Sequence, residues 1–140
     1  MELLTKLGND LVGIAAVYPN GYETKKRADG HLVNEWGMVF KETGLYSEFI
    51  EYPLEKARSK QDIMKYSFPD PMAEGRFNVA RTTIKNYKGE FVIIGDLETS
   101  IFETAWYLVG LEKFLMDLGV YPLLFIPEIV GILGSSQPFT

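Results

Sequence analysis

Two short apolar runs, separated by about 75 residues, are the clearest pattern in this chain. They are LVGIAAV at residues 11–17 and FVIIG at residues 91–95, and glycine, proline or polar residues bound both. Runs of this length are typical of strands buried on both faces, as in a parallel sheet. Between them, residues 76–87 place Phe77, Ala80, Ile84 and Tyr87 at helical spacing, so we expect a helix there.

The segment after the first run has the pattern of a β-hairpin. Residues 22–28 and 31–40 flank the dipeptide Asp29-Gly30, which readily supplies the positive φ angles of a tight turn. Residues 45–52 are rich in aromatic and β-branched side chains and predict a further extended segment that ends at Pro53.

Two capping boxes predict helix starts. Ser59 and Asp62 open a helix over residues 60–66, which the proline-containing segment 67–71 ends. Ser100 and Glu103 open a mostly apolar helix over residues 100–118. The order of strand, hairpin, helices, strand and helix predicts an α/β fold with parallel strands and right-handed crossovers.

Composition narrows the classes of protein. The chain has 140 residues, of which 46% are hydrophobic, so a single domain with a core is expected. The net charge is −5 and the only dense basic cluster is at residues 25–27, which predicts no nucleic-acid partner. There is no cysteine and no signal-peptide pattern, so a reducing cytoplasm is the expected location.

One apolar stretch, residues 120–133, is too short to span about 30 Å of hydrocarbon, and Pro122, Pro127 and Glu128 interrupt it. We therefore expect no membrane span, and predict that this stretch is buried or docks on a partner.

A string of motifs resembles the uroporphyrinogen decarboxylase family, which includes related corrinoid-dependent methyltransferases. The string begins with NEWGMVFKETGLYSEFIEYPLE at residues 34–55 and YSFPDP at residues 66–71. Arg76, FVIIG and FETAWYLVGLEKFLMDL follow in the same order. In the branch that the chain resembles, the first motif begins D-E-W-G, and this chain has Asn34 in place of the aspartate. The resemblance covers about Leu7 to Leu118.

The resemblance implies a (β/α)₈ barrel, which ordinarily needs about 250 residues. Residues 11–17 would be its second strand and residues 91–95 its third. The expected fold is therefore a partial TIM-barrel segment of about two strands with crossover helices and a β-hairpin insertion, in one incomplete domain over residues 1–140. Because the tail GSSQPFT departs from the family, a truncated or frame-shifted product, or a partial gene model, is expected.

The resemblance also implies which chemistry the chain lacks. Tetrapyrrole decarboxylation needs cationic groups for the substrate carboxylates and an acid for the pyrrole carbon, but Val17 or Tyr18 stands at the position of the family's aspartate. The methyltransferases use His and Cys ligands on zinc, and this chain has one histidine and no cysteine. We therefore assign no catalytic residue, metal site or cofactor; zinc and a corrinoid partner would belong to full-length relatives.

Five residues are candidates for substrate contacts. Tyr18, Asn20 and Asp96 follow the two apolar runs, where barrels place their ligands. In the hairpin, Trp36 would stack on a flat ligand and Glu35 would accept a hydrogen bond. The alternatives are that Trp36 packs in the hairpin core, that Glu35 caps a turn and that Asp96 lies in a polar loop.

Three hypotheses of function follow. The first is the N-terminal part of a barrel protein that binds a tetrapyrrole or a methyl donor, with corrinoid-dependent methyl transfer as the expected activity of this branch, and is inactive alone. The second is a small non-catalytic binding or assembly module, with Trp36, Tyr46 and Tyr52 as a ligand face and residues 120–133 as a docking segment. The third is an incomplete barrel that self-association or a complementary polypeptide completes.

Overall fold

The computed structural model describes residues 6–96 and 101–120. In these residues the fold is mixed α/β, with a two-stranded parallel sheet, a four-stranded antiparallel sheet and four helices. The parallel sheet does not close into a barrel within the described chain. The contacts divide the chain into two compact units, Met1–Gly21 with Met72–Glu98 and Tyr22–Pro71 with Thr99–Thr140.

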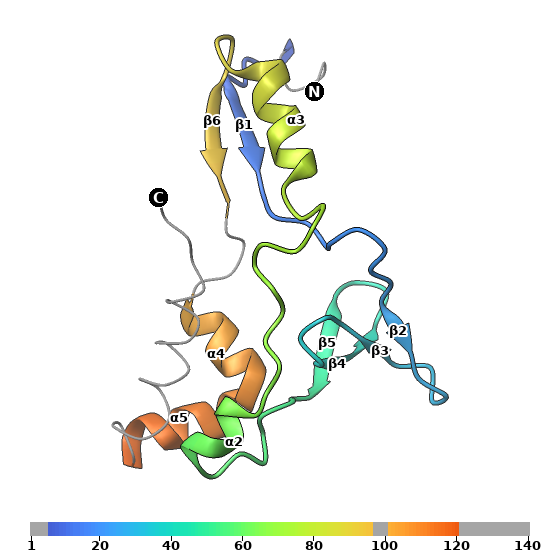
Figure 1. The fold of residues 1–140 in the computed structure, drawn as a ribbon, viewed down its shortest axis with the longest axis vertical. Coiled ribbons are helices and arrows are strands. Elements are labelled where there is room, and N and C mark those ends of the chain that lie inside the picture. The colour runs from blue at the N-terminus through green and yellow to red at the C-terminus, as the bar shows by residue number, and fades with distance from the viewer. Residues whose placement is uncertain (1–5, 97–100, 121–140) are drawn as a thin grey trace. The chain divides into compact units, whose positions relative to one another are not determined.

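The first unit is a β–α–β arrangement. Strand β1 (Leu11–Ile14) and strand β6 (Val92–Gly95) pair in parallel, and helix α3 (Asn78–Tyr87) precedes β6 and packs beside β1 (Figure 1). The register runs from Leu11 opposite Val92 to Ile14 opposite Gly95. The predicted parallel pairing and the predicted helix between the two runs are confirmed.

The prediction that these strands are buried on both faces is wrong. Strand β1 ends at Ile14 rather than at residue 17, and only Val12 of its residues is buried. On the opposite face, Leu11, Val92 and Ile94 are 42%, 57% and 44% exposed. The reason is that α3 packs against the pair on one side, and no described segment covers the other face.

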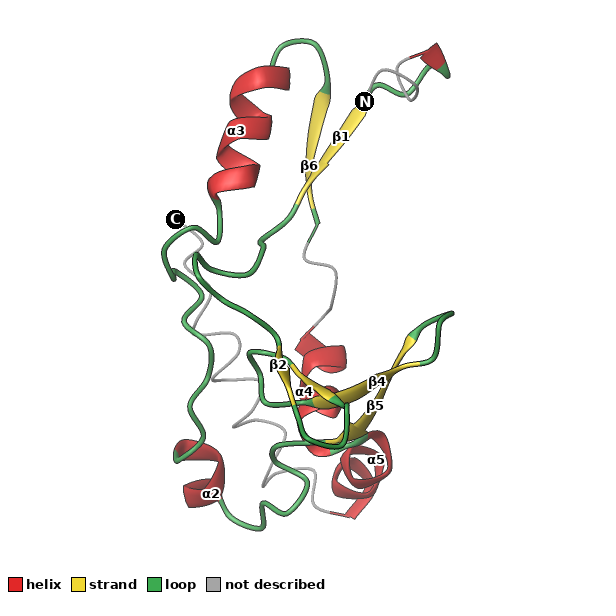
Figure 2. Ribbon diagram, turned by 90° about the vertical axis from the view of Figure 1, so that its right-hand side faces the viewer, coloured by secondary structure: helices red, strands yellow, loops and turns green. Residues whose placement is uncertain are grey.

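The second unit contains the antiparallel sheet, in the order β2-β3-β4-β5. Figure 2 shows three of its strands, β2, β4 and β5. Its strands are β2 (Lys25–Lys26), β3 (Leu32–Val33), β4 (Val39–Glu42) and β5 (Ser47–Glu51). The Asp29-Gly30 turn is confirmed, because Gly30 has a φ of +89° and joins β2 to β3. The expected strand over residues 31–40 is interrupted, because a second turn separates β3 from β4.

The β4–β5 pair contains an irregularity of one residue. Val39 lies opposite Glu51 but Phe40 lies opposite Phe49, so Ile50 is an extra residue in β5. The Phe40 and Phe49 rings pack edge to face, with their centroids 5.9 Å apart. As a result Phe49 and Ile50 are both half-buried although they are consecutive in the chain.

The helices of the second unit confirm one prediction and correct another. Helix α2 (Lys60–Met64) begins with the predicted capping box of Ser59 and Asp62. The single helix expected over residues 100–118 is two helices, α4 (Ile101–Val109) and α5 (Leu111–Val120), because Gly110 has a φ of +87°. The predicted cap at Ser100 and residues 121–133 of the apolar stretch lie outside the described residues.

The hydrophobic core lies in the second unit. Eight buried side chains from the loops, α2, α4 and α5 form it: Met38, Leu54, Ala57, Ile63, Ala105, Leu108, Val109 and Phe114. In the described part of the first unit the buried apolar side chains are Val12 and Ala80. Among the described helices, none has the length and apolar character needed to cross a bilayer.

Candidate functional site

The carboxyl ends of β1 and β6 carry three of the predicted contact residues. The Asp96 N–H donates to the Ile14 carbonyl at 2.7 Å, so Asp96 lies directly beyond the ladder. Tyr18 and Asn20 lie in the loop that follows β1, and the Tyr18 side chain is 51% exposed. A phenol, an amide and a carboxylate therefore follow the carboxyl ends of two neighbouring parallel strands, where α/β proteins place ligands.

The loop after β1 is held by the segment that precedes α3. The Val17 N–H donates to the Arg76 carbonyl at 3.0 Å, and the Asn20 N–H donates to the Glu74 carbonyl at 2.8 Å. Gly75 has a φ of +89°, and a Cβ at this position would lie 2.1 Å from Asn20 Oδ1. Only glycine suits this position, for both reasons.

Arg76 contributes a further contact to the same loop. Its side chain is 8% exposed, and Nη1 donates to the Val17 carbonyl at 3.3 Å. The motif string contained Arg76, but nothing in the sequence indicates that it is buried or that it contacts the loop. Its hydrogen bond lies within the loop that leads to Tyr18 and Asn20.

The other two predicted residues, Glu35 and Trp36, lie in the turn between β3 and β4, in the second unit. Asn34 organises this turn, since its Oδ1 accepts hydrogen bonds from the N–H groups of Trp36 and Met38, both at 3.1 Å. The Gly37 N–H donates to the Asn34 carbonyl at 3.0 Å, with a φ of +73° at Gly37. A side chain that caps this turn is thus Asn34, through its Oδ1.

Trp36 is tied to the core. Its half-buried side chain packs against the core cluster, and its carbonyl accepts a hydrogen bond from the Tyr66 hydroxyl. Burial, and to a smaller extent the Glu35 carboxylate, raise the pKa of Tyr66 well above its ordinary value of 10.0. These contacts favour a packing role for Trp36.

The five predicted residues are divided between the two units, with Tyr18, Asn20 and Asp96 in one and Glu35 and Trp36 in the other.

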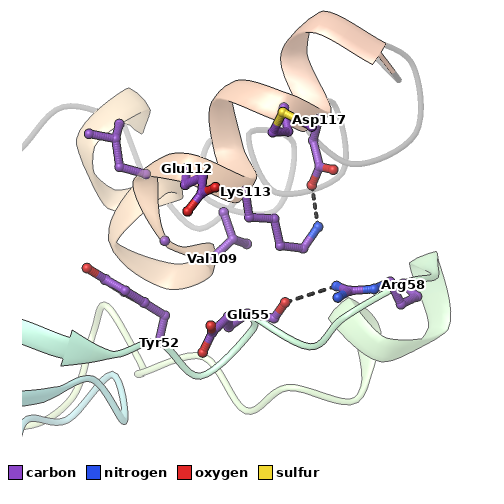
Figure 3. Close-up of a pocket in the computed structure, with 10 residues that line it drawn as sticks. Tyr52, Glu55, Arg58, Val109, Glu112, Lys113 and Asp117 are labelled. Carbon is purple, nitrogen blue, oxygen red and sulfur yellow. Dashed lines mark hydrogen bonds and ion pairs between the residues drawn. The ribbon is translucent and has the colours of Figure 1, made fainter.

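A second candidate site is an open cleft of about 800 Å³ within the second unit (Figure 3). The loop after β5 forms one wall and the junction of α4 and α5 forms the other. Its lining residues are Tyr52, Glu55, Arg58, Val109, Gly110, Leu111, Glu112, Lys113, Met116 and Asp117.

Most of the charged groups in this cleft have local partners. Lys113 and Asp117 form an ion pair one helical turn apart, and Arg58 Nη1 donates to the Glu55 carbonyl at 3.0 Å (Figure 3). Burial, and then the Glu55 carboxylate, raise the pKa of Tyr52. The sequence predicts Tyr52 as part of a ligand face. It does not predict the opposite wall of the cleft, because that wall depends on the break between α4 and α5 at Gly110.

No group of three or more His, Asp or Glu side chains in the described residues has a geometry that would hold a metal ion. With a single histidine and no cysteine, the chain cannot supply a zinc site made of His and Cys ligands. Comparison with models of known protein families, with curated proteins and with solved structures finds no significant match.

Proposed function

We propose that this chain is part of a uroporphyrinogen decarboxylase-like β/α barrel protein, of the branch related to corrinoid-dependent methyltransferases. The observation that carries the proposal is the parallel β1–α3–β6 arrangement, which has the connectivity of two neighbouring barrel strands. The motif string occurs in the family's order around these elements.

In this proposal the loop after β1 and the residue after β6 contact the substrate, a tetrapyrrole or a methyl donor. The Tyr18 ring packs against the ligand, and Asn20 and Asp96 offer hydrogen-bonding groups to it. The hydrogen bonds from Val17 and Asn20 to the segment before α3 fix the loop before the ligand arrives.

The chain is expected to be inactive alone. It has neither the family's aspartate after the first apolar run nor a His and Cys ligand set for zinc. The purified chain should therefore release no carbon dioxide from uroporphyrinogen and transfer no methyl group from methylcobalamin to a thiol. Robust turnover in either assay would contradict this part of the proposal.

Ligand binding tests the remaining part. We expect cobalamin or an octacarboxylate porphyrin to bind the chain in equilibrium dialysis, and Tyr18→Ala to weaken that binding by about tenfold, as loss of one aromatic contact does. Tyr46→Ala is the matched control, since Tyr46 is 64% exposed but lies between β4 and β5 in the other unit. No binding of either ligand would refute the proposed substrate class.

Tyr52→Ala, compared with Tyr18→Ala, tests the second candidate function, a non-catalytic binding module. The cleft beside Tyr52 is the observation that favours it. Under this alternative, ligand affinity would fall in Tyr52→Ala, which lines the cleft, whereas Tyr18→Ala would bind as the unchanged chain does.

A further inference from the structure

Tyr18 lies between two anchored peptide groups in the loop after β1. On its N-terminal side, Val17 is bonded through both of its backbone groups. Its N–H donates to the Arg76 carbonyl at 3.0 Å, and its carbonyl accepts from Arg76 Nη1 at 3.3 Å. Beyond Tyr18, the Asn20 N–H donates to the Glu74 carbonyl at 2.8 Å. The backbone is therefore held immediately before Tyr18 and again soon after it.

Pro19 restricts the chain between these two anchors. Its ring fixes its own φ at about −65°, and it disfavours a helical conformation for Tyr18, the residue before it. The Val17 carbonyl belongs to the peptide group that joins Val17 to Tyr18, so the hydrogen bond from Arg76 restrains the backbone that directly precedes the phenol. The direction of the Tyr18 side chain thus depends on the contact that Arg76 makes.

Arg76 is suited to hold this loop by its burial and its charge. Its side chain is 8% exposed, and it lies directly before the residue at which α3 begins. A guanidinium group stays charged in proteins and donates several N–H groups in one plane. Hydrogen bonds from a charged donor are about twice as strong as those between neutral groups. An apolar side chain of similar length would fill the same volume but would leave the Val17 carbonyl without this donor.

Gly75 holds the side chain of Asn20 by close contact. A Cβ at residue 75 would lie 2.1 Å from Asn20 Oδ1, 2.4 Å from Asn20 Cγ and 2.9 Å from the Asn20 backbone nitrogen. The carboxamide therefore lies directly over the Gly75 Cα, at a distance that only glycine permits. A larger residue at this position would displace the Asn20 side chain.

We propose that Gly75 and Arg76 are positioning residues, which hold Tyr18 and Asn20 in the arrangement in which these two side chains meet the ligand. Neither positioning residue touches the ligand itself. A loop that is ordered before the ligand arrives loses less entropy on binding, so this arrangement raises affinity. The inference rests on the proposed function for the identity of the ligand, but the order of the loop is measured in the ligand-free chain.

Hydrogen exchange followed by NMR tests the role of Arg76 without a ligand. In Arg76→Met we expect the amide hydrogens of Val17 and Asn20 to exchange about tenfold faster, because loss of a hydrogen bond from a charged donor changes an equilibrium by about that factor. Arg76→Lys keeps a charged donor and should retain part of the protection. Arg81→Met, at an exposed position of α3, is the matched control and should leave these amides unchanged.

The amide hydrogens of α3 and β6 distinguish positioning from a general contribution to stability. A positioning residue changes exchange in the loop and leaves exchange in α3 and β6 as in the unchanged chain. Equal acceleration in all three segments, or loss of the folded first unit in Arg76→Met, would assign Arg76 to the stability of the unit and overturn the proposal. Unchanged exchange in the loop would overturn it as well.

Gly75→Ala tests the other positioning residue, with Gly89→Ala as its matched control. The two glycines have φ angles of +89° and +107°, but a Cβ at residue 89 would have no neighbour within 4 Å. Both variants carry the backbone strain, and only Gly75→Ala also displaces Asn20. We expect the NMR resonances of the Asn20 side-chain amide to shift in Gly75→Ala alone. Equal shifts in the two variants would overturn the role of Gly75.

Equilibrium dialysis with cobalamin and with an octacarboxylate porphyrin connects the loop to binding. Arg76→Met and Gly75→Ala should each weaken binding by about tenfold, and Arg76→Lys should weaken it less. Unchanged affinity in a variant whose loop exchanges faster would overturn the proposal and leave the proposed function intact. If neither ligand binds while the loop exchanges as expected, the proposed substrate class fails and the positioning of Tyr18 and Asn20 stands.

Discussion

Asn34 is the residue on which the turn between β3 and β4 depends. Its Oδ1 accepts two backbone hydrogen bonds, and one of the donors belongs to the buried Met38. Asparagine and aspartate both supply such an oxygen, so an aspartate at this position would keep the geometry of the turn.

Asn34→Ala should therefore lower the free energy of unfolding by about 1–3 kcal/mol, because two N–H groups lose their acceptor in a partly buried turn. Asn34→Asp retains the oxygen, so its free energy of unfolding should decrease much less. Urea denaturation followed by tryptophan fluorescence measures both. Equal losses for the two variants would show that the oxygen is not what holds the turn.

Tyr66 predicts a dependence of stability on alkaline pH. Its folded-state pKa lies above its ordinary value of 10.0, chiefly because the phenol is buried. A raised pKa means that the stabilisation is fully present below about pH 10 and is lost as the pH rises above the unfolded value. The unchanged chain should become less stable above about pH 10.

The variant Tyr66→Phe should show a shallower decline of stability above pH 10, and should lose about 1 kcal/mol at neutral pH with the hydrogen bond to Trp36. Denaturation at a series of pH values measures both effects. An identical alkaline decline in the two proteins would assign the dependence to other tyrosines.

At the scale of elements, Gly110 separates α4 from α5 and touches the aromatic wall of the cleft. Its φ is +87°, and a Cβ there would lie 3.1 Å from the Tyr52 ring. Gly44 provides a matched control, because its φ is +86° and its Cβ would have no neighbour within 4 Å.

Gly44→Ala should cost about 1–2 kcal/mol, which is the penalty for an L-residue in the left-handed region. Gly110→Ala should cost more, by about 1 kcal/mol or so, since the new methyl group also crowds Tyr52. Thermal or urea denaturation of the pair isolates the packing contribution. Equal costs would mean that the ring moves aside freely.

The elements that could be predicted from the sequence are those that depend on neighbours in the chain. The capping box at Ser59 and the Asp29-Gly30 turn need only a few consecutive residues, and both are present. The break at Gly110 was missed because a lone glycine in an apolar helical pattern is usually tolerated, and its effect here depends on a positive φ.

The candidate site divides in the same way. Asp96 could be placed directly after β6 because that strand ends with its apolar run at Gly95. Tyr18 and Asn20 lie farther beyond β1 than expected, because β1 ends at Ile14 and not at residue 17. The burial of Arg76 and the cleft beside Tyr52 could not be predicted, because both arise from contacts between segments distant in sequence.

At the scale of the whole molecule, the two units differ in how much apolar surface they bury. The second unit has a core of eight buried apolar side chains, whereas the described part of the first buries Val12 and Ala80. A two-stranded sheet is at best marginally stable in water.

We therefore predict that amide hydrogens of β1 and β6 exchange faster than those of α4 by a factor of about ten or more, since local stability follows buried contacts. Hydrogen–deuterium exchange with mass spectrometry measures this for the intact chain. Comparable protection in β1 and α4 would mean that the parallel pair is stabilised to the same degree as the core.

The extra residue Ile50 in β5 offsets by one residue the alternation of side chains between the two faces of the sheet, relative to the partner strand β4. Before it, Phe49 pairs with Phe40; after it, Glu51 pairs with Val39. An ungapped alignment of this hairpin with a relative that lacks the bulge would therefore pair inward with outward positions on one side of residue 50. Deletion of Ile50 should therefore remove the irregularity and leave Glu51 opposite Val39 and Phe49 opposite Phe40, whereas a single substitution at residue 50 keeps the extra residue.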